Sequence, residues 1–227
     1  MIEVAPGTVV VYGDIACPWA TRAVSRLVRT RRDLGLDERV QFDHRAFPLE
    51  LVNERPTPKP TLDAEIPVVA RLEPDFGFRL WTEPEWKWPG TVLLALEAVQ
   101  AAKEQGLAVS ERLDVALRRA LFCHSRCISL RPVVLDVAAT CAGLDVEALT
   151  KTLDDGVGRR AVLQQLDSAT ATGVKGSPHL FLPDGSDVHN PGIAMHWQGE
   201  HGHGSPVVDR DEPGVYVELL RRITTGP

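Results

Sequence analysis

The first fifty residues alternate between the hydrophobic spacing of a strand and that of a helix. Residues 8–12 form an apolar, β-branched run, and residues 39–44 alternate apolar with polar side chains. Between them, Trp19, Ala23 and Leu27 recur every four residues, which predicts a helix that starts near Pro18 and buries one side. The pattern therefore predicts a strand, a helix and a second strand.

The middle of the chain is expected to be helical. Residues 53–89 are rich in proline and show no clear period, which indicates a long connection with one short helix. Four helices are predicted after it: residues 91–105, a segment with Ser110 as its N-cap, residues 129–142 and residues 145–155. Together these segments predict a helical unit inserted between the two ends of the chain.

The last third returns to a mixed pattern. A helix over residues 159–172 ends at Gly173, and two short strands, residues 179–182 and 187–189, flank a turn at residues 183–186. A final helix is predicted over residues 213–224.

Cys17 is the first candidate for chemistry, because it stands where the first strand runs into the helix. The first turn of a helix has unpaired backbone N–H groups, whose partial positive charge favours a thiolate over a thiol. An ordinary thiol has a pKa of about 8.5, and this location predicts a fall toward about 7. Cys17 is therefore a candidate nucleophile.

Two segments resemble landmarks of a known family. Residues 14–20, Asp-Ile-Ala-Cys-Pro-Trp-Ala, resemble the active-site turn of DsbA-like thioredoxin-fold proteins, above all the FrnE-like branch, whose usual pattern is Asp, two residues, then Cys-Pro-Trp-Cys. Here Ala20 stands in place of the second cysteine. The residues from Val174 to Pro178 resemble the cis-proline loop of the same family. The resemblance thus includes both the cysteine turn and the loop that faces it. The Gly- and His-rich residues 195–204 also resemble a C-terminal loop of FrnE-like proteins, which implies a loop at the edge of the substrate cleft.

The resemblance covers nearly the whole chain and implies an α/β architecture. A thioredoxin-like domain would comprise residues 1–52 and 158–227, and an all-helical domain, residues 53–157, would be inserted between its strand–helix–strand half and its helix–strand–strand–helix half. This order agrees with the periodicity.

The resemblance also implies roles for single residues. Cys17 would attack as a thiolate, and Pro18 and Trp19 would shape the start of its helix. Ser177 and Pro178 would form a substrate-binding loop, together with Val174, that presents backbone N–H and C=O groups to a peptide or to glutathione. The Ser177–Pro178 bond is expected to be cis.

Asp14 and the other cysteines leave alternatives open. Buried, Asp14 could relay protons to the thiol, or it could cap the following helix. Cys123 and Cys127 are possible resolving thiols for a Cys17 disulfide, but side chains four residues apart do not readily pair on a helix, and a structural role is the other interpretation. Cys141 is expected in the core.

The predicted function is thiol–disulfide oxidoreductase or isomerase activity of the DsbA-like type. Without a second cysteine at Ala20, a monothiol mechanism is favoured, in which an external thiol resolves a mixed disulfide on Cys17. One alternative is a glutathione-dependent isomerase or transferase resembling 2-hydroxychromene-2-carboxylate isomerases and kappa-class glutathione transferases. Another is a thioredoxin-like module that binds a peptide without catalysis. The partner would be a protein or small molecule that carries a thiol or disulfide.

Composition and the lack of certain motifs exclude several other functional classes. A net charge of −6 over 227 residues argues against a nucleic-acid surface. The arginines between residues 26 and 32 are expected to end a helix, where cations complement its C-terminal dipole. No run of some eighteen apolar residues and no export signal is found, so a cytoplasmic protein without a membrane span is expected. No metal and no tightly bound cofactor are expected, only glutathione or another small thiol. The oligomeric state is left open.

Overall fold

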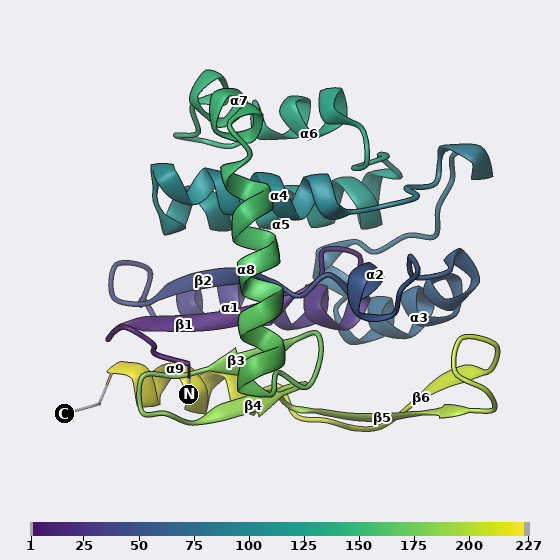
Figure 1. Cartoon of the computed structure of the whole chain (residues 1–227). Coiled ribbons are helices and arrows are strands. Elements are labelled where there is room, and N and C mark those ends of the chain that lie inside the picture. Colours follow the sequence, from purple (N-terminus) through teal and green to yellow (C-terminus); the bar gives the residue numbers. More distant parts are fainter. Residues whose placement is uncertain (1, 225–227) are drawn as a thin grey trace.

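The computed structural model describes residues 2–224, and its centre is a four-stranded sheet (Figure 1). The strands β1 (Thr8–Gly13), β2 (Gln41–Ala46), β3 (His179–Phe181) and β4 (Asp187–His189) lie in the order β2-β1-β3-β4. β1 pairs parallel with β2 and antiparallel with β3, and β3 pairs antiparallel with β4. The first and last thirds of the chain therefore meet at β1, as the thioredoxin-like fold requires.

Both faces of β1 are buried, which explains its continuous apolar run. Val9 and Val11 face the core that α1 (Pro18–Asp33) and α9 (Gly214–Thr224) share. Val10 and Tyr12 point to the opposite face, where they pack with Ala169 of α8 (Val157–Thr172). Burial of both faces fixes the strand's register and so places its carboxyl end, from which the chain turns into α1.

The inserted segment is mostly helical, as predicted. Its elements are α2 (Leu49–Val52), α3 (Lys59–Leu72), α4 (Leu93–Ala102), α5 (Leu107–His124), α6 (Arg131–Ala138) and α7 (Val146–Asp154), with short 3-10 turns at Pro74–Phe76, Glu85–Lys87 and Lys103–Gln105. In Figure 1, α4 and α5 form a layer beside the sheet, with α6 and α7 outside them. The domain boundaries proposed from the sequence stay a prediction. Helix α3 of the inserted segment packs against α1 and against β6 (Ser205–Asp211).

The structure corrects two predictions about the insertion. The proline-rich segment contains the 14-residue helix α3. Two of its prolines precede or occupy the first turn, where the missing N–H is harmless, and Pro67 lies inside the helix. Ser110 is not an N-cap, because α5 begins at Leu107 and the buried Ser110 hydroxyl donates a hydrogen bond to the Val99 carbonyl, 2.7 Å away.

The segment expected to be a loop is a two-stranded ribbon. β5 (Ile193–Gln198) pairs antiparallel with β6 (Ser205–Asp211), and the Gly- and His-rich residues between them form the turn. Figure 1 shows the ribbon extending from the β4 side of the molecule along α3. This ribbon brings residues 199–204 close to the start of α3.

Arg31 and Arg32 lie in the last turn of α1, as predicted, but two arginines earlier in the helix are placed differently. Arg22 and Arg26 are buried, and both pair with Asp211 at the end of β6. Arg26 Nε also lies 2.7 Å from Glu73 Oε2 after α3. These ion pairs, which the sequence spacing did not reveal, hold α1 against α3 and the ribbon.

Candidate active site

Cys17 is the N-cap of α1, as expected. Its Sγ accepts a hydrogen bond from the Ala20 N–H at 3.4 Å, and the thiol donates to the Ser177 carbonyl oxygen at 3.3 Å. The side chain is nearly covered, with 6% of the residue exposed. The sequence therefore located Cys17 correctly at the start of a helix, and the tertiary structure buries its side chain.

The loop opposite Cys17 has the predicted conformation. The Ser177–Pro178 bond is cis, and the Ser177 hydroxyl accepts a hydrogen bond from the Asp14 N–H at 2.9 Å. The contact from this loop to the thiol is made by the Ser177 carbonyl. Val174 packs instead with the core on the α8 side of the sheet, and its N–H donates to Ala169.

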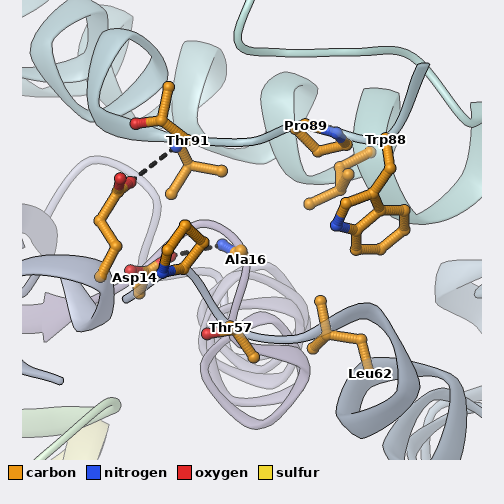
Figure 2. A pocket seen from close by; sticks show the side chains of 11 residues that line it. Asp14, Ala16, Thr57, Leu62, Trp88, Pro89 and Thr91 are labelled. Carbon is orange, nitrogen blue, oxygen red and sulfur yellow. Dashed lines mark hydrogen bonds between the residues drawn. The ribbon is translucent and has the colours of Figure 1, made fainter. Parts of the chain in front are cut away.

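Asp14, which directly follows β1, is buried. Its carboxylate accepts hydrogen bonds from the Ala16 N–H at 2.6 Å and the Leu49 N–H at 2.8 Å. Burial raises the pKa of Asp14 to about 6. Asp14 also lines a cavity of ≈20 Å³, room for about one water, beside Ala16 and Thr57 (Figure 2). These contacts support the turn and leave the carboxyl able to exchange a proton near neutral pH.

Glu65 is a site residue that the sequence analysis missed. It lies on α3 and is buried, and its Oε1 accepts a hydrogen bond from the Trp19 indole N–H at 2.8 Å. No cation is paired with it among residues 2–224, and burial raises its pKa to about 7. No hydrophobic pattern in the sequence marks Glu65 as buried, because residues 53–89 show no clear helical period. Trp19 thus links the start of α1 to a second buried carboxyl.

The prediction of a lowered thiol pKa is wrong for this structure. Burial, followed by the charge of Glu65, raises the pKa of Cys17 to about 12. The hydrogen bond from the Ala20 N–H lowers the pKa of Cys17, but by less than burial and Glu65 raise it. A helix start favours a thiolate only while the sulfur remains hydrated, and here the side chain is removed from water.

Helix α5 of the inserted segment holds the active-site turn in place. Arg118 of α5 donates from Nη1 to the Asp14 carbonyl oxygen at 2.9 Å and to Thr21 Oγ1 at 3.0 Å. The same guanidinium pairs with Asp114, with Nε 2.7 Å from Oδ2, and all four residues are buried. The turn before Cys17 is therefore fixed by a residue more than a hundred positions away.

The other cysteines are free thiols. Cys123 donates a hydrogen bond to the Phe76 carbonyl at 3.3 Å, and Cys127 follows the end of α5 at His124. Their role as resolving thiols stays a prediction. Cys141 is buried in the core, as expected, and bonds to the Val137 carbonyl.

Two histidines of the ribbon contact neighbouring side chains. His196 lies 2.9 Å from Asp209, and the His201 ring contacts Trp197. Within residues 2–224 no group of three or more His, Cys, Asp or Glu side chains is arranged to hold a metal ion. No helix in that part of the chain is long and apolar enough to cross a membrane.

The Glu65→Gln variant should change both stability and thiol reactivity. The pKa of Glu65 rises from 4.5 to about 7 on folding, so the folded state binds its proton more tightly. Stability is therefore highest below pH 4.5 and falls as the pH rises toward 7, by about 3 kcal/mol for this group. Glutamine, which cannot ionise, should remove this fall and lower the pKa of Cys17. Urea unfolding between pH 5 and 7 and alkylation rates at pH 8 check both effects.

Because the pKa of Asp14 is also raised on folding, the free energy of unfolding of Glu65→Gln should still fall as the pH rises, but by less than in the wild type. Unchanged alkylation together with an unchanged pH dependence would show that Glu65 does not act on Cys17. Glu104→Gln, a change in the short turn after α4, provides the control.

Comparison with known proteins agrees with this geometry. The model of the DSBA-like thioredoxin domain matches residues 8–199, which include the Cys17 turn, the insertion and the cis-proline loop. No curated protein matches the chain.

Several solved structures share the fold. A probable DsbA oxidoreductase from Streptomyces coelicolor is 20% identical with a TM-score of 0.65, covering 97% of this chain and 91% of its own. A 2-hydroxychromene-2-carboxylate isomerase is 18% identical with a TM-score of 0.59, over 80% and 87%. The cytosolic disulfide reductase DsbM from Pseudomonas aeruginosa, solved with GSH, is 17% identical with a TM-score of 0.56, over 80% and 89%. Since the family model spans most of the sequence and the fold is the same, the chain belongs to the DsbA-like thioredoxin-domain family.

Proposed function

We propose that the chain is a thiol–disulfide oxidoreductase or isomerase that uses Cys17 as a single nucleophile. One observation carries the proposal: the Cys17 thiol lies at the start of α1 in hydrogen-bond contact with the cis-proline loop, with Ala20 where the family has a second thiol. An external thiol then has to resolve the mixed disulfide. The membership in the DsbA-like family supports this chemistry.

The proposed cycle has two exchange steps. Cys17 sulfur attacks one sulfur of a substrate disulfide, its proton passes to a base, and the other substrate sulfur leaves as a thiolate. A second thiolate, from a small thiol, attacks the substrate sulfur of the mixed disulfide. That step releases a new disulfide and returns the electron pair to Cys17, which takes back its proton. The number of disulfides is unchanged, so the enzyme needs no second cysteine of its own.

A thiol with a raised pKa needs a proton acceptor during the attack. We assign this role to Asp14, because its pKa of about 6 suits a general base near neutral pH and because it lines a cavity with room for one water. Asp14→Asn should slow the exchange by about 10²-fold or more and change its pH profile, since general bases typically contribute that much.

The test measures transfer of glutathione from a glutathionylated peptide in the presence of reduced glutathione. The wild type should be active, and Cys17→Ser should lose the activity. Cys141→Ser, a change at a buried thiol outside the site, provides the control and should remain active. Equal activity of the wild type and Cys17→Ser would reject the proposal.

The neutral state of Cys17 favours a second candidate function. A thiol that keeps its proton is a hydrogen-bond donor, and such a donor can stabilise the thiolate of bound glutathione in an isomerase. The structural similarity to a 2-hydroxychromene-2-carboxylate isomerase supports this candidate. Here Cys17→Ser would keep the donor and much of the activity, which separates the two functions.

The proposed resolving thiol is glutathione or a related small thiol, in a reducing compartment such as the cytoplasm. The fold neighbour DsbM is a cytosolic disulfide reductase that was solved with GSH. Four free cysteines in this chain agree with such a compartment.

A further inference from the structure

A cavity of ≈170 Å³ lies between the segment that enters α3 and the turn of the β5–β6 ribbon. Its walls are formed by residues between 53 and 61 and by residues 201–203. Figure 1 shows the ribbon running along α3, so the two walls are contributed by distant parts of the chain. The volume is enough for one end group of a small molecule.

The cavity is lined by basic and neutral polar groups. Arg55, His201 and His203 contribute one guanidinium and two imidazoles, and Asn53 and Thr57 add an amide and a hydroxyl. No carboxylate belongs to its lining. The Arg55 side chain forms no hydrogen bond or ion pair with any other residue in the 2–224 range, so its donors are available to a ligand. Such a lining suits an anionic group, above all a planar carboxylate.

Close packing defines the ribbon side of the cavity. A Cβ at Gly202 would lie 2.7 Å from Thr61 Oγ1, and Gly202 has a φ of +83°. Only glycine fits this approach without a shift, which keeps the two histidines beside the start of α3. The arrangement is therefore built by the fold and not by a chance meeting of exposed loops.

The cavity adjoins the smaller cavity beside Asp14. Thr57 and Pro56 line this cavity and also the smaller one that Asp14 and Ala16 line. Thr61 precedes Glu65 by about one turn of α3, or about 6 Å along the helix. Glu65 in turn bonds to Trp19 in the first turn of α1. The shared lining residues and the Glu65 contact therefore place the cavity next to the side chains that support the Cys17 turn.

We propose that this cavity binds the carboxylate of the small thiol that resolves the mixed disulfide on Cys17, with Arg55 as the principal ligand residue. The inference rests on the proposed function, since the resolving thiol is its substrate. It names the class of that thiol: a small peptide-like thiol that carries a free carboxylate, as glutathione does. An uncharged thiol such as mercaptoethanol would not use the cavity.

Binding is measured by calorimetry on the Cys17→Ser variant, so that no covalent exchange occurs. The probes are glutathione and its diethyl ester, which lacks both carboxylates. We expect the ester to bind about tenfold more weakly than glutathione. Adding Arg55→Gln should lower the affinity for glutathione by about the same factor and leave the affinity for the ester unchanged. Arg210→Gln, a change at an exposed arginine of the same ribbon, is the matched control and should alter neither.

Three results would overturn the assignment. They are no binding of glutathione, equal affinity for both probes, or an equal loss of affinity for both probes in Arg55→Gln. Gly202→Ala gives an independent check, because displacing the ribbon turn should weaken glutathione while the fold is retained by circular dichroism. An unchanged affinity there would also count against the cavity. If exchange activity is absent in the wild type but the carboxylate-dependent binding persists, the proposed function fails while the binding site stands.

Discussion

Ala20→Cys should convert the protein into a dithiol oxidase. With glutathione disulfide as the oxidant, the variant should oxidise a peptide with two reduced cysteines at least about tenfold faster than the wild type. The new thiol would occupy the first turn of α1, where the Ala20 N–H already lies 3.4 Å from Cys17 Sγ. A thiol held this close competes with any external thiol at high effective concentration, so the mixed disulfide is resolved within the protein.

The comparison needs the wild type and a small set of matched variants. Ala20→Ser provides a matched control, because it adds a polar atom of similar size without a thiol. Cys17→Ser should be inactive in either background. If the wild type oxidises the peptide as fast as Ala20→Cys, the monothiol proposal is wrong. Loss of that wild-type activity in a Cys123→Ser/Cys127→Ser double variant would then identify a resolving thiol on α5.

Arg118→Met should destabilise the protein by about 3–5 kcal/mol, because it leaves the buried Asp114 without its cation. The Asp14 carbonyl and the Thr21 hydroxyl would lose a donor at the same time. For a chain of this length, such a change corresponds to a fall in Tm of about 10 °C. Chemical denaturation of the wild type and the variant measures the free energy of unfolding.

Two further variants make the result specific to the buried pair. Arg126→Met removes a partly exposed cation that pairs with the exposed Asp136, and it should cost less than about 1 kcal/mol. The double change Arg118→Met/Asp114→Leu removes both charges and should recover part of the stability. An equal loss in Arg118→Met and Arg126→Met would contradict the structural role assigned to Arg118.

The sequence by itself determined the features that depend on local rules. The strand, helix and strand of the first fifty residues follow from apolar spacing, and Asp145 caps α7 by accepting from the Glu147 and Ala148 N–H groups. Cys17 at the start of α1 and the cis Ser177–Pro178 bond were expected from the two motifs. The β5 strand could also have been found, because Ile193, Met195 and Trp197 alternate with smaller or polar residues.

Only the tertiary structure decided the chemical state of the site. The helix start alone predicted an acidic thiol, but α3 and the cis-proline loop cover Cys17, and the unpaired Glu65 carboxyl raises its pKa further. Arg118 was an ordinary polar position in the sequence, and its burial beside Asp14 depends on how α5 packs below the turn. Desolvation and charge act through space, so residues such as Glu65 and Arg118 are revealed only when distant segments are brought together.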